Sequence, residues 1–458
     1  MKRKLEMDMT KGPILKQLIV VAMPLVFMNL LQVLFNTADV TILGVFTNDD
    51  AVAGVGATSS LINLLISLFT GLAIGVNVVV AKAIGAKEEE RVKKQVGTSL
   101  FTAIVGGVML MLIGVFLSRK MLILMDTAPE VLDYATTYLT IYFLGAPALL
   151  LYNFCAALLR AVGETMRPFI YLAIGGAINV VLNIFFILVL GMDIDGVAIA
   201  TVVSTVFSAV MCLRLLIINK NGALKIEFKY LRFYKKEFFE IALIGIPSGI
   251  QGALFSISNV LIQSSVNSFG KEVMAGNTCA QQLEHFIAQI LVAFSQSAIS
   301  FISQNYGAKN FDRIKKTIYS SLLLVVAFGI SAGVILLAIA KPFINLTLSG
   351  QEAREAAMLR AEIMITTFTI GSTMDLLAYS LRGLNKSVTA MLVSLIGVCA
   401  FRIFWIKIIF TTMPTLTMLY ICYPISWLIT GITHGIILSI RFRNEKKKHL
   451  LTLETSVT

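Results

Sequence analysis

Long apolar stretches recur along the whole 458-residue chain, and polar turn residues bound each of them. A membrane-spanning helix needs about 20 mostly apolar residues. Twelve runs of that size lie at roughly 17–43, 52–80, 97–117, 135–157, 168–190, 194–217, 240–266, 283–304, 317–340, 362–381, 389–411 and 416–440. Charged residues are only 14% of the chain, against about 25% in soluble globular proteins. The sequence predicts an all-α, polytopic membrane protein with 12 transmembrane helices and excludes an ordinary soluble enzyme.

The basic residues indicate the orientation of these helices. If both termini are cytoplasmic, 30 of the 38 Lys and Arg residues lie on the cytoplasmic side and six on the outer side. This asymmetry is typical of multi-pass proteins, so we expect a plasma-membrane protein with cytoplasmic termini, and compact loops favour a bacterial cytoplasmic membrane. The net charge of +12 then reflects topology, and no nucleic acid partner is expected. The bilayer itself is a partner, because the tail 441–448 is basic enough to contact anionic headgroups.

Residue types that support catalysis or metal binding are scarce. The five cysteines are scattered through apolar runs and there are only three histidines, so we expect neither disulfides nor a metal site beyond a possible sodium ion. No Gly-x-Ser-x-Gly, nucleophile–base pair or Walker sequence is present. We therefore expect no enzyme activity, no cofactor and no direct use of ATP.

The chain repeats itself at an offset of 222 residues. The segment Gly85-Ala-Lys-Glu-Glu-Glu-Arg-Val-Lys-Lys94 returns as Gly307-Ala-Lys-Asn-Phe-Asp-Arg-Ile-Lys-Lys316. We therefore expect two pseudo-symmetric six-helix bundles, an N-terminal lobe at 1–220 and a C-terminal lobe at 237–458, joined by a basic linker at 221–236. Because six spans is an even number, both copies insert the same way up, as in transporters that rock two parallel repeats.

A polar group within the apolar runs of the first half suggests an ion site. Asp39 lies about four residues before the outer end of the first run at Gly44, and Asn179 and Asn183 share one helix face. Thr201 lies at a similar expected depth. A charge in the hydrocarbon core is costly and marks a functional site by default. The four side chains predict a proton or sodium site, although helix–helix hydrogen bonding by the two amides and a headgroup position for Asp39 stay open.

The second half holds two further acids, Asp375 and Glu284. Asp375 lies in the middle of its run, whereas Glu284 opens a run, where a solvated helix-start carboxylate is equally consistent. Arg402 lies inside a run and needs a partner such as Asp375, in a structural ion pair. In the first run, Pro24 removes a backbone hydrogen bond and permits a kink that could respond to Asp39.

Several of these segments resemble the multidrug and toxic compound extrusion (MATE) family, prokaryotic type. The resemblance rests on Pro24 with Asn36-Thr-Ala-Asp-Val-Thr-Ile-Leu-Gly44, on Gln304-Asn-Tyr-Gly-Ala308, and on the turns at Arg160 and Arg382. It implies a secondary active antiporter that exports cationic amphiphilic drugs or toxins in exchange for protons or sodium ions, acting as a monomer. It also implies that Asp39, Asn179, Asn183 and Thr201 form the ion-coupling site.

The chain departs from the family pattern at two positions. Some members carry an acid where this chain has Asn183, and the sodium-driven branch uses a Glu near Ser256. Glu284 is a hypothetical substitute for that Glu, while Asp375 keeps the second-lobe acid.

The alternative function is a lipid-linked oligosaccharide or lipid flippase of the same superfamily. Such proteins resemble this architecture but carry about fourteen spans and a cationic cavity, whereas the only cations within the runs here are Arg402 and Lys407. A major-facilitator transporter requires a Gly-x-x-x-Asp-Arg-x-Gly-Arg loop that the chain lacks. We therefore expect drug export.

Overall fold

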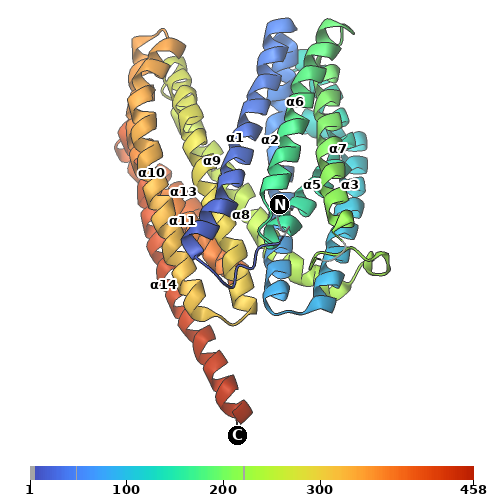
Figure 1. Cartoon of the computed structure of the whole chain (residues 1–458). Coiled ribbons are helices and arrows are strands. Elements are labelled where there is room, and N and C mark those ends of the chain that lie inside the picture. Colours follow the sequence, from blue (N-terminus) through green and yellow to red (C-terminus); the bar gives the residue numbers. More distant parts are fainter. Residues whose placement is uncertain (1–5, 48, 220–221, 458) are drawn as a thin grey trace. The chain divides into compact units, whose positions relative to one another are not determined.

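The computed structural model describes residues 6–47, 49–219 and 222–457, and within these ranges it contains helices and no strands. The helices of the first half are α1 (Ile14–Phe46), α2 (Asp49–Gly85), α3 (Glu89–Leu124), α4 (Pro129–Leu144), α5 (Ala146–Ala161), α6 (Met166–Leu188) and α7 (Ile194–Ile218). They are followed by η1 (Phe228–Tyr230), α8 (Lys235–Asn267), α9 (Lys271–Gly307), α10 (Phe311–Thr347), α11 (Gln351–Gly383), α12 (Ser387–Ser394), η2 (Leu395–Ala400), α13 (Phe401–Phe404), η3 (Trp405–Phe410) and α14 (Leu416–Val457). Figure 1 follows this order along the chain.

Ten helices of the described chain are long and apolar enough to cross a membrane, or eleven if α4 and α5, bent by 49° at their junction, count as one span. The expected count of twelve is not reached because α11, which covers the expected run at 362–381, is not among them. This helix has 33 residues, but it includes Arg360, Asp375 and Arg382 and 16 of its residues are buried. Its packing against α9, α10 and α14 explains its composition, since a helix covered by protein needs less apolar surface than one that faces lipid.

The chain forms two compact units, and the division between them differs from the expected boundaries. Unit 1 comprises Phe27–Gly245 with the short segment that ends at Asp8, and unit 2 comprises Met9–Val26 with Ile246–Thr458. Helices α1 and α8 are therefore each divided between the units, close to their internal prolines Pro24 and Pro247. A simple hydropathy count cannot foresee this, because both halves of each helix are apolar.

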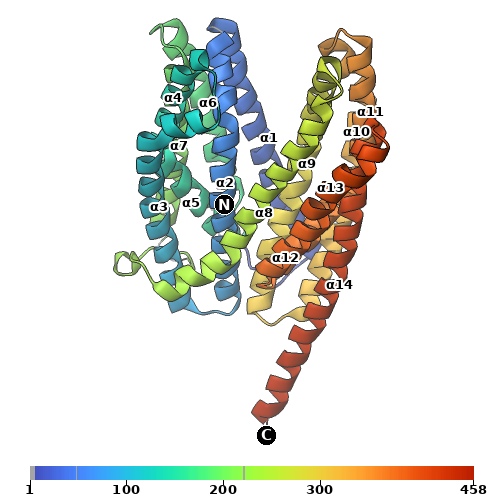
Figure 2. The ribbon, with the colours of Figure 1, turned by 180° about the vertical axis from the view of Figure 1, so that it is seen from behind.

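Unit 1 is built from antiparallel neighbours. Helix α6 packs along α7, and α3 packs against α4 and α5; Figure 2 labels these five helices. The first part of α8 joins this unit by a close approach of backbones. A Cβ atom on Gly75 of α2 would lie 2.3 Å from the carbonyl oxygen of Ile241, and one on Gly245 would lie 2.6 Å from Leu72 Cα.

We expect Gly75→Ala to destabilise the protein by about 1–3 kcal/mol, because the added methyl group meets a backbone atom that cannot move aside. Gly56→Ala is the matched control on the same helix, since a Cβ there meets nothing within 4 Å and alanine favours a helix by about 0.5–1 kcal/mol. Thermal unfolding of both variants in detergent tests the prediction, and equal midpoints for the two would contradict it.

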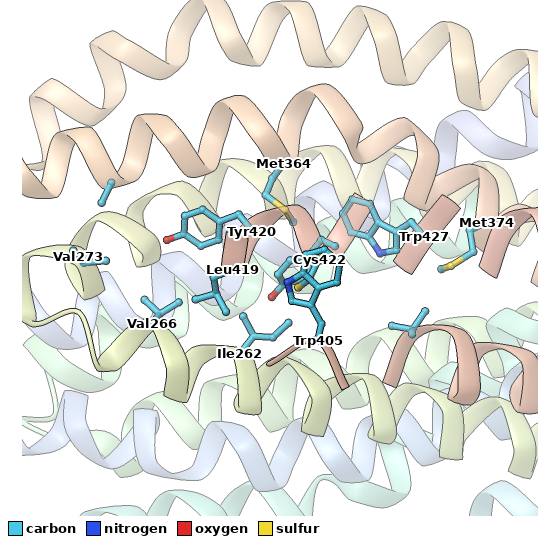
Figure 3. Close-up of a cluster of buried hydrophobic side chains, with 13 residues drawn as sticks. Ile262, Val266, Val273, Met364, Met374, Trp405, Leu419, Tyr420, Cys422 and Trp427 are labelled. Atoms are coloured by element: carbon cyan, nitrogen blue, oxygen red, sulfur yellow. The ribbon is translucent and has the colours of Figure 1, made fainter. Parts of the chain in front are cut away.

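Unit 2 has α11 at its centre, packed against α9, α10 and α14. A buried cluster joins α8, α9, α11, η2, η3 and α14, and it contains both tryptophans of the chain, Trp405 and Trp427, beside Tyr420 and Cys422 (Figure 3). The C-terminal part of α14 extends beyond the other helices of this unit (Figure 1) and carries the basic tail.

Ion pairs hold the linker that precedes α8. Glu227, which precedes η1, accepts from Lys93 Nζ of α3 at 2.9 Å and from Lys229 Nζ at 3.1 Å. Hydrogen bonds from Lys93 and Lys229 lower the pKa of Glu227 from 4.5 to about 2.

A carboxyl whose pKa is depressed on folding stabilises the folded form above its unfolded pKa, and this contribution disappears as the pH falls through its folded pKa. We therefore expect the protection of the backbone amides of residues 222–231, measured relative to their intrinsic exchange rates, to fall as the pH is lowered from about 4.5 to about 2. Glu227→Gln, compared with wild type at each pH to cancel intrinsic exchange rates, should show lower protection at pH 4.5, and the two should converge near pH 2. A wild type that keeps its protection at the lower limit contradicts the expectation.

Candidate functional site

Asp39 lies deep within α1. The helix continues to Phe46, three residues beyond the expected end of the first run, so Asp39 is seven residues from the end of the helix. At 1.5 Å per residue, these seven residues correspond to about 10 Å of helix. From the sequence we expected only about four residues between Asp39 and the outer end. The side chain is half-buried, so protein covers part of it.

The three other predicted residues of this group surround the Asp39 carboxylate within unit 1. Asn183 Nδ2 of α6 donates to Asp39 Oδ1 at 2.6 Å, and Thr201 Oγ1 of α7 donates to Asp39 Oδ2 at 3.4 Å. Asn179 lies one turn before Asn183 on α6, and the amide groups of the two residues are 3.4 Å apart. Asn179 and Asn183 are four residues apart on α6, and α6 packs along α7. Three polar side chains therefore meet at one carboxylate.

The orientation of the Asn179 amide completes this arrangement. When its nitrogen faces Asp39, that nitrogen donates to Oδ1 at 2.8 Å, and its oxygen accepts from the Thr201 backbone N–H at 3.3 Å, with the Thr201 hydroxyl oxygen also 3.3 Å away. This orientation satisfies both ends of the amide, whereas the reverse one faces oxygen with oxygen. Asp39 Oδ1 then accepts two amide hydrogen bonds.

One buried acceptor of this group has no partner. Asn183 is fully buried, and its Oδ1 atom accepts no hydrogen bond from any residue that the structure describes. Leaving a buried acceptor unpaired costs about 1–3 kcal/mol. Carboxylate, amide and hydroxyl oxygens are the ligand types that hard cations prefer, so the chemistry of the four side chains fits a small cation or a proton on Asp39.

In unit 2 the structure pairs Glu284 of α9 with Arg360 of α11. Arg360 Nε donates to Glu284 Oε1 at 2.6 Å and Nη2 donates to Oε2 at 2.8 Å, while Nη1 donates to Asn277 Oδ1 at 2.9 Å. Arg360 is 3% exposed and Glu284 is 7% exposed. The pair was missed because its partners are 76 residues apart and no local pattern links them.

The expected pairing of Arg402 with Asp375 is wrong. Among the described residues Arg402 forms no ion pair, and it donates instead to Asn259 Oδ1 at 3.1 Å and to Ser426 Oγ at 3.3 Å, with the Tyr423 ring 4.2 Å away. Neutral acceptors and an aromatic face, supplied by α8 and α14, take the place of the carboxylate. Asp375 is half-buried and receives no side-chain hydrogen bond within the described part of the chain.

No group of three or more His, Cys, Asp or Glu side chains that could hold a metal ion occurs in the described ranges. The five cysteines are all buried and unpaired with one another.

Comparison with known proteins agrees with this architecture. The model of the MatE family matches the chain twice, at residues 24–185 and 247–408. The probable multidrug resistance protein YoeA of Bacillus subtilis is 27% identical over 383 residues, which is 82% of each chain. YpnP of the same organism, also a probable multidrug resistance protein, is 30% identical over 67% of this chain and 68% of its own length.

Solved structures share the fold. A multidrug resistance MATE family transporter of the MOP superfamily, solved in an outward-facing conformation, aligns with a TM-score of 0.88 and 18% identity over 96% of this chain and 98% of its own. A MOP superfamily transporter from Pyrococcus furiosus aligns with a TM-score of 0.89 at the same identity and coverage. Two matches to one family model over most of the chain confirm the resemblance seen in the motifs: this protein belongs to the MatE family of multidrug and toxic compound extrusion transporters.

Proposed function

We propose that this protein is a secondary active antiporter that exports cationic amphiphilic compounds in exchange for protons or sodium ions. Its family and the multidrug names of its relatives support export of such compounds. The protein is then a monomeric, multi-pass protein of a bacterial cytoplasmic membrane. The same relatives favour drug export over transport of lipids or lipid-linked oligosaccharides.

The observation that carries this proposal is the cluster around Asp39. A carboxylate on a membrane-crossing helix, contacted among the described residues only by the neutral groups of Asn179, Asn183 and Thr201, holds a negative charge without a basic partner. Such a charge is costly in an apolar environment. A proton or a sodium ion removes this cost, and its arrival and departure therefore couple to the geometry of α1.

The two occupancy states need different hydrogen bonds. The ionised carboxylate accepts from the amide groups of Asn179 and Asn183, as described above. A protonated Asp39 has a hydroxyl to donate, and a bound cation needs oxygen ligands, so in either case at least one amide must present its oxygen. Rotation of the Asn183 amide, whose oxygen has no partner in the present geometry, is the smallest change that achieves this.

For the second lobe, we propose different roles for its two acids. Glu284 is already neutralised by the bidentate Arg360, which suits a structural counter-ion better than an exchanging site. Asp375 receives no hydrogen bond from the described side chains and is the better candidate for ion or substrate contact. Pro24 lies where α1 passes from unit 2 to unit 1, which suits a bending point.

We also propose that α11 crosses the membrane as an additional span, which gives twelve with the α4–α5 pair and places both termini in the cytoplasm. Its 33 residues are about 50 Å long at 1.5 Å per residue, which exceeds the roughly 30 Å of the hydrocarbon core. Its charges are accommodated by burial within unit 2.

Ethidium efflux from proteoliposomes tests the function. The purified protein is reconstituted, and efflux is driven either by a pH gradient or by a sodium gradient of equal size. We expect one gradient to drive efflux above that of protein-free liposomes, which also identifies the ion. Efflux under neither gradient would refute drug antiport, and a fluorescent lipid would then be the next substrate to test.

A further inference from the structure

The repeated motif identified in the sequence forms two equivalent turns, one between α2 and α3 and one between α9 and α10. Lys87 and Lys309, 222 residues apart, have the same left-handed backbone, with φ of 59° and 58°. Arg91 and Arg313 follow each turn at the same distance and occupy equivalent positions in the two repeats. Neither arginine takes part in the proposed coupling site around Asp39.

Arg313 of α10 binds the segment that leads into α1. Its Nε donates to the carbonyl oxygen of Met9 at 2.8 Å, its Nη1 to that of Gly12 at 2.8 Å and its Nη2 to that of Lys11 at 2.7 Å. Nη2 also donates to Gln17 Oε1, at 2.9 Å, in the first turns of α1. All three nitrogens of the guanidinium group are thus used on one short stretch of backbone, which we call the entry segment (residues 9–12).

The last turn of α9 adds two amide contacts to the entry segment. The Met9 backbone N–H donates to Gln304 Oε1 at 3.2 Å, and Asn305 Nδ2 donates to the Met9 carbonyl oxygen at 3.1 Å. The Met9 side chain is fully buried. Side-chain donors and one side-chain acceptor therefore replace the helical partners that this backbone lacks before α1 begins.

Arg91 of α3 makes the corresponding contact in unit 1. Its Nη2 donates to both carboxylate oxygens of Glu240, at 2.9 and 2.7 Å, and Glu240 lies in the early part of α8. Each arginine therefore binds the beginning of a helix whose later part belongs to the other unit. In the expected topology, both of these helix beginnings are cytoplasmic. Arg313 holds the start of α1 on unit 2, and Arg91 holds the start of α8 on unit 1.

We propose that Arg313 and Arg91 are positioning residues for transport, each anchoring the start of one of the two helices that pass between the units. Helix α1 is then held at two places, by Arg313 at its entry segment and by the hydrogen bonds to Asp39 further along. A change of ion occupancy at Asp39 shifts one unit relative to the other only if the far end of α1 stays fixed. This inference rests on the proposed antiport function and adds the anchors to it.

The first test measures the anchor itself and does not depend on transport. A cysteine is introduced at Thr10 in the entry segment, and its labelling by a maleimide is followed in nanodiscs. The five native cysteines are buried, so background labelling is low. We expect Arg313→Gln to raise the labelling rate about tenfold or more, because several charge-assisted hydrogen bonds are lost. Lys316→Gln, an exposed charge loss on the same helix, should leave the rate unchanged.

The second test measures positioning. In proteoliposomes, Arg313→Gln should lower gradient-driven ethidium efflux at least about fivefold, the lower end of typical coupling between sites, while ethidium affinity without a gradient stays at the wild-type value. Arg313→Lys should be intermediate, because a single ammonium cannot reach all three carbonyl oxygens. Unchanged labelling overturns the anchor, and faster labelling with normal efflux overturns the positioning role. If the wild type itself pumps under neither gradient, the antiport proposal fails, yet the labelling comparison still decides the anchor.

The Arg91 anchor has a sharper control, because its partner is a side chain. Arg91→Glu should lower efflux in the same way. The exchange Arg91→Glu with Glu240→Arg should restore it by reversing the pair, in a Glu88→Gln background because Glu88 also pairs with Arg91. Failure of the exchange to restore any efflux would overturn the role of this contact.

Discussion

Asp39→Asn is expected to lower gradient-driven ethidium efflux by roughly 5- to 150-fold, the usual range of energetic coupling between two sites. The variant keeps the size of the side chain and a hydrogen-bonding oxygen, but it can neither carry the negative charge nor exchange a proton. Efflux of the wild type and the variant is compared under a pH gradient and under a sodium gradient. Thermal stability of the variant should equal or exceed that of wild type, since the isolated charge is removed.

Asp133→Asn serves as the matched control. Asp133 pairs with Arg119 at 2.6 Å, with a side chain that is 80% exposed, and its replacement should leave efflux unchanged. If Asp39→Asn pumps as well as this control, ion coupling does not depend on Asp39 and moves to the second lobe, where Asp375→Asn is the next variant.

Removing one partner of the Glu284–Arg360 pair should destabilise unit 2 by about 3–5 kcal/mol, because it leaves an uncompensated buried charge. The pair is bidentate and almost fully buried, and the Tyr420 hydroxyl also donates to its third partner, Asn277, at 3.2 Å. We expect Arg360→Met to show the full loss. The double variant Glu284→Met with Arg360→Met should recover much of it, because no charge is left unpaired.

The two tryptophans provide the measurement. Trp405 and Trp427 both lie in the buried cluster of unit 2 with Tyr420 (Figure 3), so intrinsic fluorescence during denaturation reports on this unit. Arg119→Met breaks the exposed ion pair described above and should cost no more than about 1 kcal/mol. A double variant less stable than either single variant would contradict the electrostatic explanation. Loss of efflux in Glu284→Gln at unchanged stability would instead give Glu284 a coupling role.

Much of the fold could be predicted because its signals are local. Apolar runs of sufficient length predicted most of the membrane helices, and the repeat at offset 222 predicted two equivalent turns, which share the left-handed lysines 87 and 309. The family, too, was recognisable from short motifs and is confirmed by the two matches of its model. Helix α11 shows the limit of hydropathy, since a helix enclosed by protein can carry charges that a lipid-facing helix cannot.

The group around Asp39 was predictable in its members but not in its geometry. The spacing of Asn179 and Asn183 on one helix face follows from the helical repeat alone. The amide orientations, the unpaired oxygen of Asn183 and the true depth of Asp39 depend on how α1, α6 and α7 pack. Each of these details bears on which ion the site accepts.

The sequence by itself determined the features that arise from neighbouring residues: the membrane helices, the duplication, the family and the polar residues that lie within apolar runs. Tertiary structure alone decided the partners of charges that are far apart in the chain. It paired Glu284 with Arg360, gave Arg402 neutral partners, and divided α1 and α8 between two units with an arginine at the start of each. The physical reason is that hydropathy and helical periodicity act over a few turns, whereas the cost of a buried charge is met by whichever donor or acceptor packing brings within hydrogen-bond distance.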